Sequence, residues 1–105
     1  MGRIVITCYR PKKGKKTTLE ELTNEHYGIL REEGLVTNRT PIIMKSVDGC
    51  IIEVFEWKSK DSIDQAHSNP KIQKLWERYG EACDFEKPIN IAEFENIFSE
   101  FEPFN

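Results

Sequence analysis

The sequence predicts an α+β protein of ferredoxin-like architecture, in which one antiparallel sheet carries both main helices on the same face. Strand-like and helix-like patterns follow one another in the order β-α-β-β-α-β. An Asp-Gly pair at residues 48–49 separates the two central strand patterns and predicts a tight hairpin. The chain has 105 residues, enough for one hydrophobic core, so we expect a single domain over residues 1–105.

The first strand is predicted over residues 3–9. Residues 4–6 are Ile-Val-Ile, apolar in succession rather than alternating with polar residues, so we expect both faces of this strand to be buried. The segment 10–16 then places five cations around a proline and a glycine, which break regular structure. It lacks the glycine spacing of a phosphate-binding loop, so we interpret it as a solvated loop.

The first helix is predicted to begin at Thr17, because Thr17 to Glu20 fits the capping-box pattern. Gly34 supplies the stop at its C-terminal end. One face of this helix carries an apolar stripe at helical spacing, which includes one histidine. The stripe consists of Leu19, Leu22, His26, Ile29 and Leu30.

The central hairpin joins strands predicted over residues 41–47 and 50–57. A two-residue type I′ turn at Asp48-Gly49 would place Met44 opposite Glu53 and Ile43 opposite Val54. Glu53 would then share its sheet face with apolar side chains and have no cationic partner on the adjacent strand. These neighbours are Ile42, Met44, Ile51 and Phe55.

The second half of the chain predicts a helix in two pieces. Ser59 caps a short helix over residues 60–67, and Asn69 caps a second helix in which Pro70 takes the first position. Both helices present an inward apolar and aromatic face. Its members are Ile63, Ala66, His67, Ile72, Leu75, Trp76, Tyr79 and Cys83.

The end of the chain predicts a fourth strand over residues 85–88 and a short C-terminal helix beginning at Asn90. The apolar stripe of that helix would be Phe94, Ile97, Phe98 and Phe101. The tail 102–105 is expected to pair at a sheet edge or to cross to a partner subunit.

The strands supply apolar groups to both faces of the sheet, although helices are predicted on only one. A second copy of the chain would cover the other face, because a two-fold contact buries the same patch on each subunit. We therefore expect a homodimer.

Composition excludes several partners. The net charge of −3 gives no reason to expect nucleic acid or an anionic membrane, and no apolar run is long enough for a membrane span. The N-terminus enters a strand pattern without a signal peptide, so we expect a cytoplasmic protein. The three cysteines are widely spaced, which predicts neither a disulfide framework nor a zinc site. A small organic ligand is the expected partner besides a second copy.

Three segments carry a family resemblance: residues 9–15, the strand end at residues 56–59, and Ala-His-Ser-Asn-Pro at residues 66–70. Across residues 3–88 the chain resembles the antibiotic biosynthesis monooxygenase-like branch of the dimeric α+β barrel proteins. The resemblance implies a barrel formed by two sheets across a homodimer. It also implies a pocket, since this family includes cofactor-independent oxygenases of polycyclic phenols, haem-degrading enzymes, and small isomerases and lyases.

The haem-degrading members can be compared residue by residue. When Trp57 and Ser59 are aligned with their counterparts, the tryptophan and histidine that those enzymes need fall on Ala66 and Trp76, and their asparagine falls near Thr7. All three required residues are missing. Haem cleavage is disfavoured, and we expect no cofactor.

Three residues are candidates for catalysis. His67 lies where the first short helix ends and could act as a general base, or it could be a packing histidine. Glu53 is a carboxylate in apolar surroundings, where it could abstract a proton or pair with a first-strand group or a partner subunit. His26 is more typical of a hydrogen-bonded core histidine, although such helix residues also line pockets. No local spacing unites these three residues into a metal site.

Four aromatic side chains are candidates for binding a flat ligand by stacking, and core packing is an equally good interpretation of them. They are Tyr9, Trp57, Trp76 and Tyr79. Two functions remain open. The first is a cofactor-independent monooxygenase-like enzyme acting on a planar phenolic substrate, and the second is a non-catalytic homodimeric metabolite-binding or accessory protein. An RNA-recognition module is excluded, because residues 50–57 lack its Lys/Arg-Gly-aromatic pattern.

Overall fold

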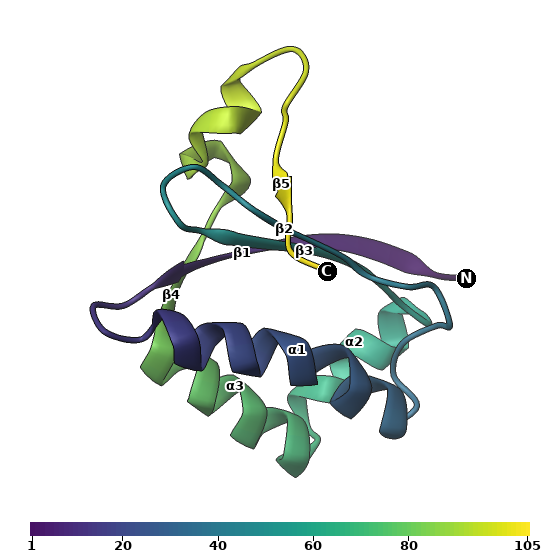
Figure 1. Cartoon of the computed structure of the whole chain (residues 1–105). Helices are drawn as coiled ribbons and strands as arrows, with labels where there is room; N and C mark the ends of the chain where they lie inside the picture. The colour runs from purple at the N-terminus through teal and green to yellow at the C-terminus, as the bar shows by residue number, and fades with distance from the viewer.

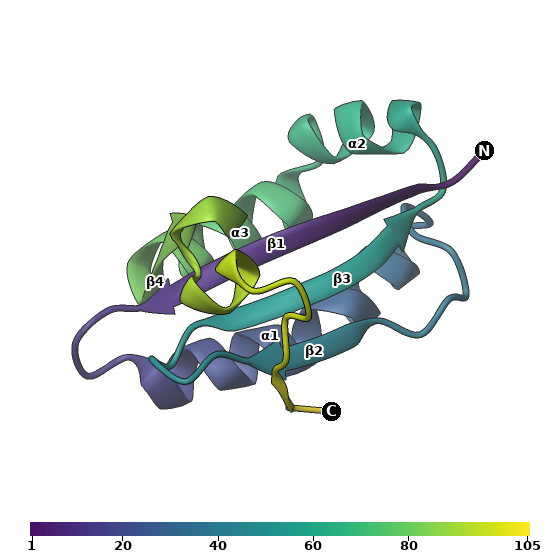
Figure 2. The same ribbon diagram turned by 90° about the horizontal axis from the view of Figure 1, so that it is seen from above.

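The computed structural model describes all residues, 1–105, and is built on one five-stranded antiparallel sheet (Figure 1). The strand order is β4-β1-β3-β2-β5, and every neighbouring pair runs antiparallel. All three α-helices lie under one face of the sheet, and the C-terminal segment crosses the opposite face (Figures 1 and 2). The elements are β1 (Arg3–Pro11), α1 (Lys16–Glu32), β2 (Ile42–Lys45), β3 (Ile51–Trp57), α2 (Lys60–His67), α3 (Pro70–Ala82), β4 (Cys83–Glu86) and β5 (Glu102–Pro103).

The predicted caps of the two later helices are confirmed. The Ser59 side chain accepts a hydrogen bond from the backbone N–H of Ser62, which starts α2. The Asn69 side chain accepts from the backbone N–H groups of Lys71 and Ile72, with Pro70 in the first turn of α3. These caps satisfy amides that have no partner within the helix. Together they fix the break between α2 and α3, which aims the two helices in different directions beneath the sheet (Figure 1).

The predicted capping box of α1 is wrong, although its apolar stripe and its end are right. The helix begins at Lys16 after the N-cap Lys15, and no side chain caps it. Gly14, at φ 77°, turns the chain immediately before this helix, so Thr17 already lies within the first turn and cannot serve as its cap. Gly34, at φ 71°, ends the helix as predicted.

The central hairpin has a different turn from the predicted one. The backbone N–H of Ser46 donates to the Cys50 carbonyl, which closes a loop of three residues instead of two. A type I′ turn needs positive φ at both central positions, but only Gly49 has it, at 94°. Ser46 Oγ also bonds Asp48 and the Cys50 amide, which stabilises the wider loop.

This loop shifts the β2–β3 register by one residue. Ile43 lies opposite Glu53, and Met44 lies opposite Ile52. Because side chains alternate between faces, the shift moves Ile42 and Met44 to the helix-free face, away from Glu53. On β1, Thr7 lies opposite Glu53.

The C-terminal helix that was predicted is absent. Residues 88–95 form two short 3₁₀ turns instead, and Ile97 and Phe98 are 95% and 85% exposed. The segment is anchored by Ile91, which is completely buried against the helix-free face of the sheet. Ile91, Phe94 and Phe101 pack on the sheet there, whereas Ile97 and Phe98 of the predicted stripe do not. The contacts they make are with Cys8, Met44, Cys50 and Ile52.

The last strands differ from prediction by small shifts. β4 begins at Cys83, two residues before the predicted strand, so Cys83 belongs to the sheet and not to the face of α3. The tail pairs at the free edge of β2, which was one of its two predicted alternatives, with the Phe104 N–H donating to the Ile43 carbonyl. None of the helices combines the length and the apolar character that a membrane span requires.

Candidate functional site

A cavity of about 380 Å³ lies between the helices and the sheet face that they cover. β1, β3 and β4 form one wall, and α1, α2 and α3 form the other. Most of its lining is apolar or aromatic, which is typical of small-molecule pockets. The lining residues are Val5, Thr7, Tyr9, His26, Phe55, Trp57, Ile63, His67, Trp76, Tyr79 and Phe85.

One lining residue, a histidine, contacts a buried carboxylate behind the cavity wall. Glu53 on β3 has no exposed surface, and His26 on α1 is 3% exposed. The Nδ1 atom of His26 lies 2.9 Å from Oε1 and 3.1 Å from Oε2 of Glu53. The other ring nitrogen, Nε2, makes no hydrogen bond within the protein. If Nδ1 carries the proton and donates it to the carboxylate, Nε2 is left as an acceptor on the cavity side.

Two hydroxyl groups of β1 continue this polar network. The Tyr9 hydroxyl donates to Oε1 of Glu53 at 2.8 Å, and Thr7 Oγ1 donates to the Tyr9 oxygen at 2.9 Å. Thr7 and Tyr9 share a face of the strand because they are two residues apart. Glu53 therefore has partners on both sides, so a buried carboxylate is satisfied without any lysine or arginine.

Burial raises the pKa of the Tyr9 hydroxyl well above its usual value, and the nearby Glu53 carboxylate raises it further. Burial, followed by Glu53, also raises the pKa of Tyr79. Both phenols are therefore neutral at physiological pH and cannot act as bases, and Tyr9 serves as a hydrogen-bond donor to Glu53. The Tyr79 oxygen has no hydrogen-bond partner, so a Tyr79→Phe exchange would remove none.

His67 lies at the exposed rim of the cavity, apart from the buried network. Its ring packs edge-on against Trp76, with the ring centroids 5.0 Å apart, and its backbone carbonyl accepts a hydrogen bond from Gln73. Ile63, one turn earlier on α2, lines the same rim. The structure thus separates the two histidines into a buried one paired with Glu53 and an exposed one that packs on an aromatic ring.

The four aromatic residues predicted to bind a flat ligand all line the cavity. Tyr9 and Tyr79 lie with ring centroids 4.9 Å apart, and His26 packs edge-on against Tyr79 at 5.3 Å. Trp57 packs against Phe55 with centroids 5.4 Å apart. Aromatic faces and edges therefore surround the space next to the His26 ring, and a planar ligand could stack there.

Sequence reasoning missed part of the lining, namely Val5, Thr7, Phe55, Ile63 and Phe85. Alternation along β1 could have identified Val5 and Thr7, since they share a face with Tyr9. Phe85 could not be found in this way, because its place depends on β4 pairing with β1, where it lies opposite Tyr9.

Metal and thiol chemistry find no support in the arrangement of side chains. No group of three or more His, Cys, Asp or Glu side chains lies close enough to hold a metal ion. His26 and Glu53 are paired with each other, and His67 lies at the rim. The three cysteines are buried, and burial raises the pKa of Cys50 and Cys83 to about 11. Such thiols are protonated near neutral pH and are weak nucleophiles.

Comparison with known proteins places this chain among ferredoxin-like α+β proteins. No protein-family model matches the sequence, and no curated protein matches it. Among solved structures, the fold is similar to that of Rv0793 from Mycobacterium tuberculosis, with a TM-score of 0.64. The two chains share 18% sequence identity, over 88% of this chain and 99% of that chain. At this identity the similarity shows the fold alone, and it confirms the predicted fold class.

Proposed function

We propose that the cavity binds a planar phenolic molecule and that His26 and Glu53 remove its hydroxyl proton. The observation that carries this proposal is the pairing of a completely buried carboxylate with a histidine that lines an otherwise apolar, aromatic cavity. Buried ionisable groups beside a cavity are candidates for functional sites. The resemblance to cofactor-independent oxygenases of polycyclic phenols favours the same chemistry.

In the proposed binding mode, the ligand hydroxyl donates to Nε2 of His26 while its rings stack between the aromatic side chains. His26 accepts the proton as a general base. Glu53 accepts the hydrogen bond from Nδ1–H, which holds the ring in the productive tautomer and stabilises the imidazolium that forms. Tyr9 keeps the Glu53 carboxylate in position through its own hydrogen bond.

The phenolate then reacts with molecular oxygen, as the resemblance implies. For 1-naphthol, one oxygen atom becomes the carbonyl at the ring carbon para to the hydroxyl. The other oxygen atom leaves as water, with the hydroxyl hydrogen and the hydrogen of that ring carbon. The substrate is oxidised to 1,4-naphthoquinone and oxygen is reduced, so no cofactor enters the balance.

The test combines binding and turnover. Purified protein should bind 1-naphthol more tightly than naphthalene, which lacks the hydroxyl, and should consume one O₂ for each quinone formed. Glu53→Gln and His26→Gln should each lower the turnover rate by about 100-fold or more, since a general base accelerates a reaction by about 10² to 10⁴-fold. His67→Gln should reduce turnover far less, because His67 lies at the rim.

Two results would change the proposal. Tight binding of 1-naphthol without oxygen uptake would favour the alternative function, a non-catalytic metabolite-binding protein. If neither compound binds, or if both bind equally well, the role assigned to His26 is wrong.

We further propose that the chain forms a homodimer through the helix-free face of its sheet. Ile4, Ile6 and Ile42 on this face are 58%, 48% and 60% exposed. Exposed apolar patches of this kind mark interaction sites. The C-terminal segment covers the neighbouring half of the same face, so the contact would lie beside that segment. Analytical ultracentrifugation at micromolar concentration should show a dimer, and Ile6→Glu should give a monomer. A wild-type monomer would contradict the proposal.

A further inference from the structure

We infer that the cavity accepts neutral ligands and rejects carboxylates and phosphates. This inference names the ligand class of the proposed site and rests on the proposed function. Its first support is the absence of a countercharge, since no lysine or arginine lines the cavity. A carboxylate or phosphate is usually recognised by a fork of arginine donors or by a lysine ammonium group.

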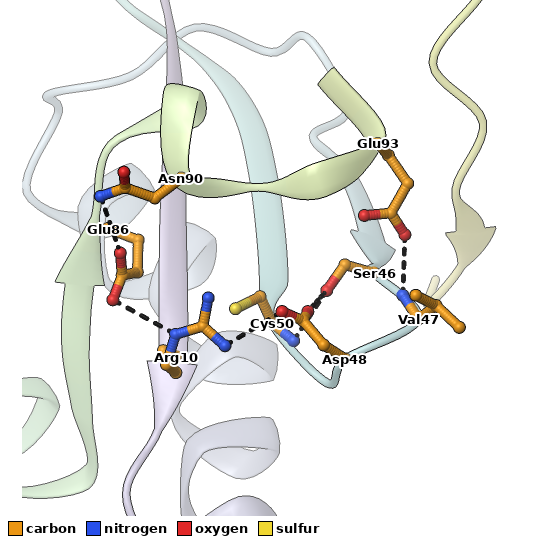
Figure 3. Close-up of polar contacts among 8 residues, drawn as sticks. All are labelled: Arg10, Ser46, Val47, Asp48, Cys50, Glu86, Asn90 and Glu93. Carbon is orange, nitrogen blue, oxygen red and sulfur yellow. Dashed lines mark hydrogen bonds and ion pairs between the residues drawn. The ribbon is translucent and has the colours of Figure 1, made fainter. Parts of the chain in front are cut away.

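Two cations that follow the lining residues of β1 point away from the cavity. Arg10 follows Tyr9 but lies on the opposite face of the sheet, where it pairs with Asp48 at 3.1 Å and Glu86 at 3.2 Å (Figure 3). Lys12 donates to the Gly80 carbonyl at 2.7 Å. These contacts fix both side chains away from the cavity.

Lys45 extends from the helix-covered face of β2, and it too is engaged. Its Nζ lies 2.8 Å from a carboxylate oxygen of Glu20 and 4.9 Å from the centre of the Phe104 ring. Moving it toward the cavity would break a partly buried ion pair and leave Glu20 without its partner. None of Arg10, Lys12 and Lys45 is therefore free to pair with an anion in the cavity.

The buried pair adds a second barrier. His26 and Glu53 together carry either no net charge or one negative charge, depending on whether the imidazole is protonated. In neither state does the pair present a net positive charge to a ligand. An anionic group that enters this space loses its hydration without gaining a counterion. When the imidazole is neutral, the negative charge of Glu53 also repels it.

A neutral hydroxyl, ketone or amide meets neither penalty. A hydroxyl can donate to Nε2 of His26, and the rest of a flat ligand contacts aromatic and aliphatic side chains. The same cavity thus combines polar recognition at one point with apolar packing elsewhere, an arrangement that suits a neutral planar molecule.

The test uses two ligands of nearly the same shape, 5-hydroxy-1-naphthamide and 5-hydroxy-1-naphthoate, which differ by one charge. Isothermal titration at pH 7.5 should give at least tenfold tighter binding of the amide. Equal affinities, or tighter binding of the carboxylate, would overturn the inference while leaving the proposed function intact. Binding of neither compound, when 1-naphthol also fails to bind, would overturn both.

A gain-of-function variant provides an independent measurement. Ile63 is half-buried at the rim, so Ile63→Arg can place a guanidinium at the cavity mouth. Binding of 5-hydroxy-1-naphthoate should then tighten about tenfold relative to Ile63→Gln, the matched neutral variant, while binding of the amide stays the same in both. An unchanged preference between the two ligands in Ile63→Arg would show that missing countercharge is not the cause of the selection.

Discussion

The two faces of the sheet differ in which side chains they bury and which they expose. The helix-covered face hides polar groups, since Glu53 and His26 are buried beside an aromatic cavity. The helix-free face leaves apolar groups in the open, since Ile4, Ile6 and Ile42 are about half exposed or more. Folding alone favours burying apolar side chains and exposing polar ones. One face thus holds a buried polar pair and the other an exposed apolar patch, which we propose to be the ligand site and the dimer contact.

The largest expected difference between the faces is in stability. His26→Leu should lower the free energy of unfolding by about 3 kcal/mol, because Glu53 would keep only the Tyr9 hydroxyl as a side-chain partner. Ile6→Ala, on the open face, should cost the fold of a single subunit about 1 kcal/mol or less, because half of that side chain is exposed there. Any loss of the proposed dimer contact would come in addition and would depend on protein concentration. Urea unfolding of both variants measures the difference.

The double variant Glu53→Gln/His26→Leu measures how strongly the two side chains depend on each other. It should lose less stability than the two single variants add up to, since removing the charge also removes the penalty of leaving it unpaired. Additive losses would mean that the two side chains stabilise the protein independently of each other.

The open face provides the second contrast, between its covered half and the exposed tip of the segment that covers it. Ile91→Ala should destabilise the protein by about 2–4 kcal/mol, because Ile91 is completely buried against the sheet. Ile97→Ala should change stability by about 0.5 kcal/mol or less, because Ile97 is 95% exposed. Thermal or urea unfolding of the pair checks whether residues 88–95 pack on the sheet. Equal effects would contradict that packing.

The hairpin loop decides which side chains lie on which face, so it gives a third prediction. Gly49→Ala should cost about 1–2 kcal/mol, because its φ of 94° is unfavourable for a residue with a Cβ. No atom lies within 4 Å of the added Cβ, so the cost is conformational and not steric. Gly28→Ala is the matched control in α1, where the Cβ is equally free and alanine should stabilise the helix by about 0.5–1 kcal/mol. A harmless Gly49→Ala would count against the three-residue loop.

The buried thiols should make the free energy of unfolding depend on pH, but only at alkaline pH. Burial raises the pKa of Cys50 and Cys83 to about 11 in the folded protein, from an ordinary value of 9.0. The folded state therefore holds protons that the unfolded state releases, and this contribution to stability is complete below about pH 9 and falls as the pH rises through 11. Urea unfolding at pH 7.5, 9 and 10.5 should show the loss, and Cys83→Ala should reduce it. A flat profile would show that these thiols are not sequestered.

Local signals predicted most helix ends, although the capping box at Thr17 was wrong. Ser59, Asn69 and Gly34 mark helix ends through their own backbone and side-chain chemistry, so their positions could be predicted. The register of the hairpin could not, because Asp48-Gly49 fits both a two-residue and a three-residue loop and Ser46 decides between them. The C-terminal segment could not be predicted either, since Ile91 and Phe94 keep helical spacing but pack on the sheet surface from two short 3₁₀ turns instead of an α-helix.

The candidate site shows the same limit. The sequence identified Glu53 as a carboxylate in apolar surroundings and His26 as part of a buried helical face, but it could not pair them. That pairing depends on how α1 crosses β3, a contact between residues 27 positions apart. His67 was the leading candidate because it lies beside a helix break, and the structure places it at the rim of the same cavity. The catalytic and binding roles of all these residues stay predictions.

A crystal structure of the protein with 1-naphthol would show whether the cavity binds a phenol at His26. We predict the naphthol ring among Tyr9, Trp57 and Tyr79, with its hydroxyl oxygen about 2.6–3.2 Å from Nε2 of His26. A naphthol molecule bound only on the helix-free face, or one whose hydroxyl turns away from His26, would contradict it.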